Sequence, residues 1–312
     1  MALAVSEANT VSTSIYDKTI TPQVYDSIDF LKWLRANNKI RKDGGKNITF
    51  PIRYKKLGRA KSVGWGDQED FQAVPTRTQA VLDWAPYRAS TLITWEQRVK
   101  NGQGKTRIVN LMEDKAKELV EDMKDKMASD LWATTFVSAH MVPMYTIVDS
   151  ADSYAGIAVA DASIWAGKED SSSTQMTRAL FHTQVQAAKF GEDDGPSRFY
   201  TTRALYADYA TLLTGDERYV DSKKMNTGPD ALALYSMPVL TDPYIAAGDF
   251  FGLDASKFEL WVFEDDDMDV SEWYELGESG YRKSMAKYVT NVCQLVCRER
   301  RTSFKLTALT GT

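Results

Sequence analysis

The sequence has few of the residues that build disulfides and metal centres. It contains two cysteines, Cys293 and Cys297, and two histidines, His140 and His182, in 312 residues. The cysteines fall in a segment that is predicted to be a strand, where four residues span about 13 Å, whereas a disulfide requires Cα atoms within about 7 Å. We therefore expect free thiols, which are typical of a reducing compartment. Neither histidine has a second ligand at zinc spacing, so no zinc site is predicted.

Long apolar runs and an excess of basic residues are also missing. No run approaches the roughly 18–20 apolar residues of a membrane span, and the N-terminus lacks an export signal. We expect a soluble protein that is made in the cytoplasm and has no membrane partner. The 38 Lys and Arg against 43 Asp and Glu give a net charge of −5. Because binding to a phosphate backbone requires clustered Lys and Arg, nucleic-acid binding by the whole surface is not expected.

Catalytic and cofactor motifs are absent as well. Gly102–Thr106 resembles a phosphate loop, but the first glycine of that motif would fall at Val99, so a tight turn is favoured. No Gly-x-Ser-x-Gly elbow is present. The residues Asp265, Asp266 and Asp267 lack the alternating oxygen ligands of a calcium loop, which favours a solvated turn. We predict no catalytic, cofactor-binding or metal-binding residues, although paired carboxylates for glycoside hydrolysis stay open among the 43 acids.

The most prominent feature that is present is a predicted helix from Thr106 to Thr135, about 40 Å long. Asn110 and Glu113 resemble a cap, so the regular helix could begin there. Its apolar residues recur three to four positions apart and form one stripe: Ile108, Leu111, Met112, Ala116, Leu119, Met123, Met127 and Leu131. The pairs Glu113 with Lys117 and Asp122 with Lys126 are at i,i+4 on the charged face. The helix is either a spine that carries two less autonomous regions or the longest helix of an ordinary α+β core.

The segment before this helix predicts an extended arm, a helix and a hairpin. Residues 1–20 have no sustained period, and a helix is predicted from Thr21 to about Asn38. Alternating apolar residues predict strands at 47–54, 78–84 and 87–95, with Pro51 restricting the first to an edge position.

The connection Gly58–Thr76 contains Trp65, Phe71 and an acidic run with Asp67, Glu69 and Asp70. It is either a surface loop or an intermolecular contact. A long hairpin is marginally stable alone in water, and its exposed aromatic residues would be buried by another copy of the protein.

After the long helix the pattern is that of an α/β region followed by closing strands. We predict helices at 177–190 and 204–213, strands at 198–202, 238–240, 258–263, 271–276 and 281–300, a polar loop at 215–228 and a short tail.

The order of these parts resembles the tailed-phage major capsid protein family, with the Hong Kong 97-type fold that encapsulins share. Four stretches resemble that family: Gly44-Gly45-Lys46-Asn47-Ile48-Thr49-Phe50-Pro51, Tyr87-Arg88-Ala89-Ser90 with Asn101-Gly102, Ser197-Arg198-Phe199-Tyr200-Thr201-Thr202, and Met237-Pro238-Val239-Leu240-Thr241-Asp242 with Gly248-Asp249-Phe250-Phe251-Gly252-Leu253. Thr94-Trp95-Glu96 departs from the usual Ser-Gly-x-Glu.

The resemblance implies an α+β fold with the following division: an N-terminal arm and short helix at 1–46, an extended-loop hairpin at 47–100, a peripheral domain with the spine helix at 101–176, an axial domain at 177–265, and peripheral strands with a C-terminal tail at 266–312. It also implies that the extended loop contacts neighbouring subunits. The expected contact residues are Trp65, Asp67, Glu69, Asp70 and Phe71.

The implied function is that of a major capsid protein, which is not an enzyme and has no cofactor. It would assemble with itself into pentamers and hexamers of an icosahedral head, in the host cytoplasm and then in the virion, and enclose double-stranded DNA without sequence-specific binding. Further expected partners are a portal, a decoration protein and a separate scaffolding protein, since little sequence precedes Thr21. The alternatives are an encapsulin-like compartment or a carbohydrate-active hydrolase that uses its acids and eight tryptophans.

Overall fold

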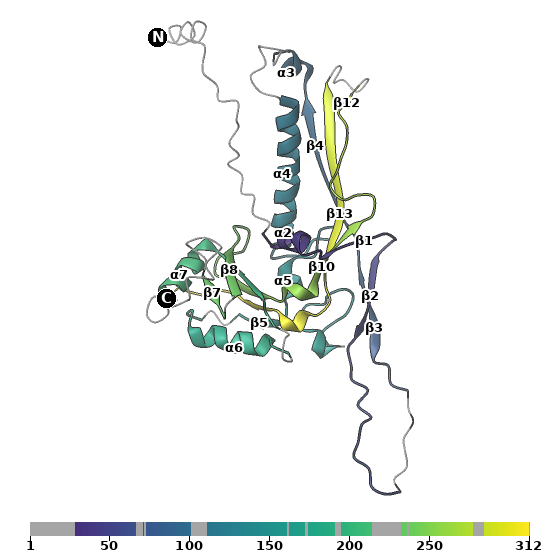
Figure 1. The fold of residues 1–312 in the computed structure, drawn as a ribbon, viewed down its shortest axis with the longest axis vertical. Coiled ribbons are helices and arrows are strands. Elements are labelled where there is room, and N and C mark those ends of the chain that lie inside the picture. The colour runs from purple at the N-terminus through teal and green to yellow at the C-terminus, as the bar shows by residue number, and fades with distance from the viewer. Residues whose placement is uncertain are drawn as a thin grey trace. The chain divides into compact units, whose positions relative to one another are not determined.

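The computed structural model describes residues 29–66, 71, 73–100, 111–160, 162–171, 174–190, 195–213, 232–235, 237–276 and 284–311. The chain divides into two compact units (Figure 1). Unit 1 comprises Met1–Asp26, Arg88–Lys124 and Val270–Val289, and unit 2 comprises Ser27–Tyr87, Asp125–Asp269 and Thr290–Thr312. The predicted arm at 1–20 and the polar loop at 215–228 lie outside the described residues, and the predicted division into five regions stays a prediction.

Unit 1 contains α3 (Trp95–Lys100), the first part of α4 (Leu111–Leu131), β12 (Tyr274–Glu275) and the start of β13 (Met285–Cys297). β12 pairs antiparallel with β13, with Tyr274 opposite Ala286. The ring centroids of Tyr288 and Tyr274 lie 6.1 Å apart. The guanidinium of Arg88 lies 5.0 Å from the ring centroid of Tyr288. The closing strand predicted at 271–276 is therefore shorter than expected.

Helix α4 confirms the predicted long helix but ends at Leu131 rather than at Thr135. The N–H of Trp132 still reaches the carbonyl of Ala128, after which the turn tightens, and the β-branched Thr134 and Thr135 follow. The predicted apolar stripe is buried at Leu119, Met123, Met127 and Leu131.

One of the two predicted ion pairs on α4 forms. Lys117 lies 3.1 Å from Glu113, as expected. Lys126 instead contacts Asp130, at 2.6 Å, so the predicted pair with Asp122 is wrong. Asp130 is nearly buried, and a carboxylate in that position requires a partner more than the exposed alternative does.

The first sheet of unit 2 contains β1 (Ile40–Asp43), β10 (Phe258–Phe263) and the second half of β13. β1 runs parallel to β10, and β10 runs antiparallel to β13. The helix α2 (Asp29–Ala36) covers β10, with Phe30 edge-on to Phe258 at 5.4 Å. Cys293 and Cys297 are buried free thiols in β13, which confirms that prediction.

The second sheet of unit 2 has the strand order β5-β14-β9-β6-β8-β7, with α6 and α7 packed against it (Figure 1). The bounds are β5 Lys168–Asp170, α6 Arg178–Ala188, β6 Arg198–Thr201, α7 Arg203–Leu213, β7 Ala233–Leu234, β8 Met237–Thr241, β9 Phe250–Leu253 and β14 Phe304–Leu306. Shorter elements are α5 Met144–Ile147, η2 Ser163–Trp165, η3 Ala255–Lys257, η4 Arg300–Thr302 and β11 Asp269–Val270.

This sheet corrects the prediction of a short tail. β14 is fully buried between β5 and β9, so residues 304–306 belong to the core rather than to a tail. The core cluster consists of Met176, Phe181, Val185, Ala188, Phe199, Leu205, Tyr209, Val239, Phe250, Phe304, Leu306 and Leu309. The predicted helix at 177–190 is confirmed, and its cap is Thr177, whose hydroxyl accepts the N–H of Leu180.

The hairpin of unit 2 consists of β2 (Ile48–Arg53) and β3 (Arg77–Leu82), with Ile48 opposite Leu82 and Arg53 opposite Arg77. β4 (Ala85–Ile93) follows. β2 alternates buried and exposed residues as predicted, and among the described residues the strand that contains Pro51 pairs with β3 alone. The two strands end where the long connection 54–76 begins.

Candidate assembly interface

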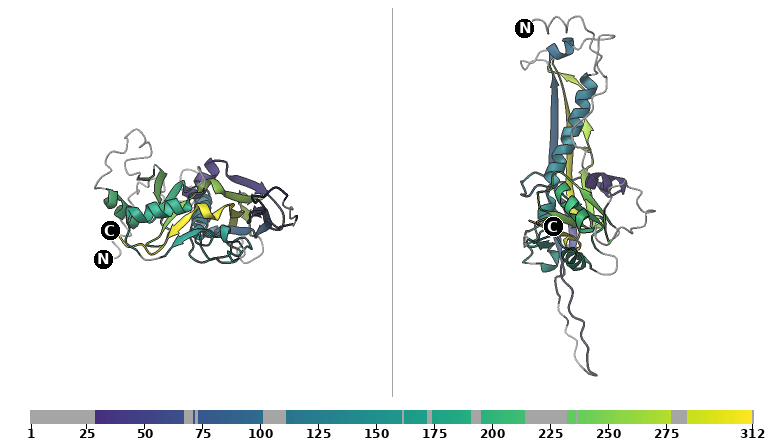
Figure 2. Two further views of the ribbon diagram at one scale, coloured as in Figure 1. Left: turned by 90° about the horizontal axis from the view of Figure 1, so that it is seen from below. Right: turned by 90° about the vertical axis from the view of Figure 1, so that its left-hand side faces the viewer.

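The hairpin of unit 2 has a base that packs on its own unit and a loop that does not. At the base Ile48, Phe50, Ala80 and Leu82 are all at most 6% exposed. Beyond Arg53 the ladder ends with one further bond, from the N–H of Tyr54 to the carbonyl of Thr76. Figures 1 and 2 show the connection running out from β2 and β3, away from the two sheets of the same unit.

The loop exposes large apolar side chains. Trp65 is 109% exposed and Phe71 is 89% exposed, and Leu57 and Val63 are half-exposed. A fully exposed tryptophan within a charged loop is unusual for a monomeric protein, because its large apolar ring gains no burial. The exposed aromatic residues indicate a surface that a partner molecule covers.

Two of the five expected contact residues are described, and both are exposed. Trp65 and Phe71 lie near the end of the loop. Asp67, Glu69 and Asp70 lie outside the described residues. The sequence places their three carboxylates between the two aromatic residues, so the end of the loop combines negative charge with apolar area. Contact of these five residues with a neighbouring subunit stays a prediction.

The residues considered for catalysis do not converge in the described part of the chain. His140 Nδ1 lies 3.4 Å from the carboxylate of Asp130, and His182 contacts the hydroxyl of Tyr235. In the acidic turn, Asp267 forms an ion pair with Arg35 at 2.9 Å. No group of three His, Cys, Asp or Glu among the described residues is arranged to hold a metal ion. The loop Gly102–Thr106 lies outside the described residues.

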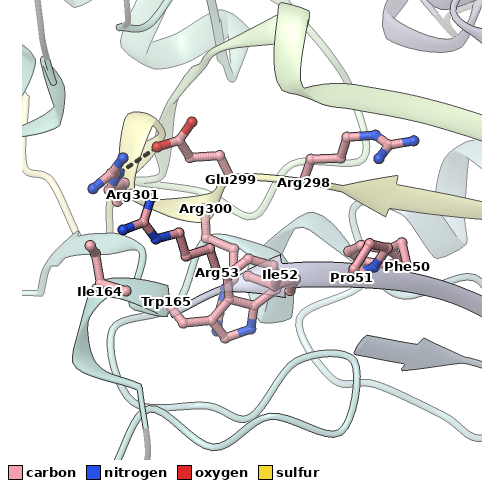
Figure 3. A pocket seen from close by; sticks show the side chains of 10 residues that line it. All are labelled: Phe50, Pro51, Ile52, Arg53, Ile164, Trp165, Arg298, Glu299, Arg300 and Arg301. Atoms are coloured by element: carbon pink, nitrogen blue, oxygen red, sulfur yellow. Dashed lines mark hydrogen bonds and ion pairs between the residues drawn. The ribbon is translucent and has the colours of Figure 1, made fainter. Parts of the chain in front are cut away.

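A pocket of about 290 Å³ lies at the base of the hairpin and was not predicted (Figure 3). Its lining residues are Phe50, Pro51, Ile52, Arg53, Ile164, Trp165, Arg298, Glu299, Arg300 and Arg301. We call it the arginine pocket. Its charged residues come from the end of β2 and from the turn after β13, where the sequence reads Arg298-Glu299-Arg300-Arg301. That basic run was the one sequence feature that could have indicated the pocket. Nothing in the sequence indicated that Arg53 lies beside it.

Three of the four arginines of this pocket already have partners. Arg298 donates two hydrogen bonds to Glu259, at 2.8 and 2.9 Å, and Arg301 pairs with Glu299. Burial raises the pKa of Glu259, but the bonds from Arg298 and Trp261 outweigh it and hold the pKa below its usual range. Arg300 is buried and donates to backbone carbonyls. The guanidinium of Arg53 has no hydrogen bond or ion pair in the described part of the chain.

No helix in the described segments is long and apolar enough to span a bilayer. No protein-family model matches the sequence, and no curated protein matches it either.

Solved structures, by contrast, match along almost the whole chain. A capsid chain of cyanophage A-1(L) is 14% identical, with a TM-score of 0.63 over 97% of this chain and 99% of that one. The capsid of a native GTA particle is 11% identical, with a TM-score of 0.70 over 98% of both chains. The SrpI encapsulin of Synechococcus elongatus is 8% identical, with a TM-score of 0.55 over 97% of this chain and 95% of that one.

At these identities the matches establish the fold. The chain therefore has the α+β Hong Kong 97-type fold of the phage capsid proteins and encapsulins that its sequence resembles.

Proposed function

We propose that this protein is the major capsid protein of a tailed double-stranded DNA bacteriophage, which assembles through pentamers and hexamers into an icosahedral head. The observation that carries the proposal is the combination of a capsid fold along 97–98% of the chain with a hairpin loop that exposes Trp65 and Phe71. A shell subunit requires apolar surface that only another copy covers.

The mechanism of assembly is geometric. The hairpin loop of one copy docks on a different surface of the next copy, which is a heterologous contact, and rotations that close produce rings. Each contact is modest, but every subunit is held by several neighbours, so the assembled shell is far more stable than any one contact. The net charge of −5 suits a container that encloses DNA without adhering to it.

The experiment is to express the chain and examine the purified protein by negative-stain microscopy and light scattering. We expect closed particles. A variant that lacks residues 58–71 should keep the circular dichroism of the folded subunit and lose the particles, since β2 and β3 remain joined by a shorter turn. Monomers of the full-length chain under all assembly conditions would contradict the proposal.

An encapsulin-like compartment is the second candidate, supported by the SrpI encapsulin match. The contents of the particle separate the two. Particles captured from the native source with an antibody against this chain should contain nuclease-protected double-stranded DNA if they are phage heads. Particles filled with an enzyme and free of DNA would favour the compartment.

A further inference from the structure

The arginine pocket has a distinctive combination of charge and apolar surface. Four arginines and one glutamate line it, together with the aromatic residues Phe50 and Trp165. Its volume of about 290 Å³ is at the lower end of the range for small-molecule sites, and it suits one or two side chains of a peptide better than a metabolite. Trp165 is held in place by stacking on Tyr154 at 5.8 Å.

One arginine of this pocket is available to a ligand. Figure 3 shows the side chain of Arg53 reaching from β2 toward the end of the pocket where Arg301 and Ile164 lie, whereas Arg298 points the opposite way. Arg53 is exposed and has no acidic partner in the described segments, and Arg300 donates to carbonyls, not to a carboxylate. The pocket therefore has uncompensated positive charge beside an apolar wall formed in part by the half-exposed Ile164. A carboxylate with an adjacent aromatic ring complements both features.

The chain itself carries such a segment. Residues 65–71, Trp65-Gly66-Asp67-Gln68-Glu69-Asp70-Phe71, which we call the tip segment, combine three carboxylates with two aromatic rings. Two other acidic stretches fit less well. In the turn 264–269, Asp267 binds Arg35 and Asp266 accepts from Thr290. The run Glu192–Asp194 contains no aromatic residue, and the nearest one, Phe190, already contacts Arg301 of its own subunit, with the guanidinium carbon 3.4 Å from the ring centroid.

We propose that the arginine pocket of one subunit binds the tip segment of a second copy, with its carboxylates on Arg53 and its aromatic side chains against the half-exposed Ile164. This assignment rests on the proposed function and names the surface on which the hairpin loop docks. Trp65 is twelve positions after Arg53, and an extended chain of that length reaches about 40 Å. The described part of the loop runs away from its own hairpin base (Figure 2), as contact with a neighbouring copy requires.

A charge exchange tests the pairing. Arg53→Glu should reduce the yield of particles at least tenfold, and so should Asp67→Lys combined with Glu69→Lys and Asp70→Lys. All four changes in one chain should restore at least a third of the wild-type yield. The control is Lys46→Glu, the same change of charge at an exposed residue before the other end of β2, and it should keep normal yield. Circular dichroism of each variant checks that the subunit folds.

A cross-link that leaves every charge in place locates the contact. With Ile164→Cys and Gln68→Cys in one chain, mild oxidation should join neighbouring subunits into a covalent ladder on a non-reducing gel. The native thiols do not interfere, because Cys293 and Cys297 are both 0% exposed. A fast-migrating monomer with an internal cross-link, or no cross-link at all, would overturn the assignment, and so would failure of the four-residue exchange.

The two proposals fail in different ways. Normal particles from the chain with Arg53→Glu would refute the pocket assignment and leave the proposed function intact. Absence of particles from the wild-type chain would refute the proposed function. The cross-link between two copies can be detected in an oligomer of any size, whether or not closed particles form. Its absence would therefore refute the pocket assignment with or without particles.

Discussion

The ring of Phe304 in β14 fills the space where Gly252 in the neighbouring strand β9 has no side chain. A Cβ atom at Gly252 would lie 2.6 Å from Cζ of Phe304, and the two residues are directly opposite in the antiparallel ladder. The ring also stacks near Phe250, with centroids 6.4 Å apart. Glycine weakens a strand by itself, so its presence here marks the close approach of an aromatic ring from the next strand.

Gly252→Ala should lower the free energy of unfolding by about 1–3 kcal/mol, because a core ring must move to admit one methyl group. The measurement is a urea titration followed by circular dichroism, under conditions that keep the chain monomeric. Gly44→Ala is the control, since no atom lies within 4 Å of a Cβ at that position. Equal effects of the two substitutions would show that the ring does not depend on Gly252.

The buried side chain of Arg300 stabilises the backbone of a neighbouring segment. Its buried guanidinium donates to four backbone carbonyls at the end of α5 and just after it, which are those of Thr146, Ile147, Asp149 and Asp152. Arg300→Met should destabilise unit 2 by about 3 kcal/mol or more, because it leaves buried acceptors without donors. Arg298→Met, which removes a partly exposed pair with Glu259, should cost less than about 1 kcal/mol. Thermal melts of both variants compare the two costs.

The ion pair between Asp149 and Lys305 predicts a loss of stability in acid. Burial raises the pKa of Asp149, but the hydrogen bond from Lys305 and those from two backbone N–H groups outweigh it and bring the pKa to about 2. Since the folded-state pKa lies below the ordinary value of 3.8, the stabilisation is complete above about pH 4 and is lost as the pH falls toward 2. Asp149→Asn should remove about 2 kcal/mol of this pH dependence. Denaturation curves at pH 2 to 5 give the free energy of unfolding of both proteins as a function of pH. The same pH dependence in the wild type and the variant would contradict the prediction.

Asp242 has the opposite effect at higher pH. It is 3% exposed, and burial raises its pKa to about 6 despite a hydrogen bond from the N–H of Tyr244. Because the folded-state pKa is above the ordinary value, protonation stabilises the fold as the pH falls from about 6 to 4. In Asp242→Asn this gain should disappear, so the stability of the variant relative to the wild type should be about 2 kcal/mol greater at pH 7 than at pH 4. A difference in the free energy of unfolding between variant and wild type that does not change with pH would refute the raised pKa of Asp242.

The elements that the sequence predicts correctly are those whose pattern is local. β2 alternates over six residues, β10 is apolar apart from Glu259, and α6 has its own cap at Thr177. The strands that were missed depend on distant partners. β1 is the short, charged segment Ile40–Asp43, which becomes a strand because it pairs with β10 more than 200 residues later. β14 has three residues and is recognised only from the sheet that surrounds it.

The same division applies to the interface. Trp65 and Phe71 can be selected from the sequence, because aromatic residues within a charged, glycine-containing loop have no local reason to be buried. The arginine pocket cannot, because Arg53 and Arg301 come from distant parts of the chain. Arg300 would be expected at the surface from its charge, and its burial follows from the four carbonyls that converge on it.

Two tryptophans of unit 2 provide the most direct separation of folding from assembly. Trp65 is fully exposed, whereas Trp165 is 3% exposed and donates from Nε1 to the carbonyl of Tyr154 at 3.2 Å. Trp165→Ser should destabilise the subunit by about 3–5 kcal/mol, the usual cost of truncating a buried aromatic residue. Trp65→Ser should change the monomer by less than about 0.5 kcal/mol. If the ring of Trp65 is buried against a neighbouring copy after assembly, Trp65→Ser should nevertheless form few particles, as measured by light scattering. A normal yield of particles would show that the ring stays exposed to water in the assembled shell.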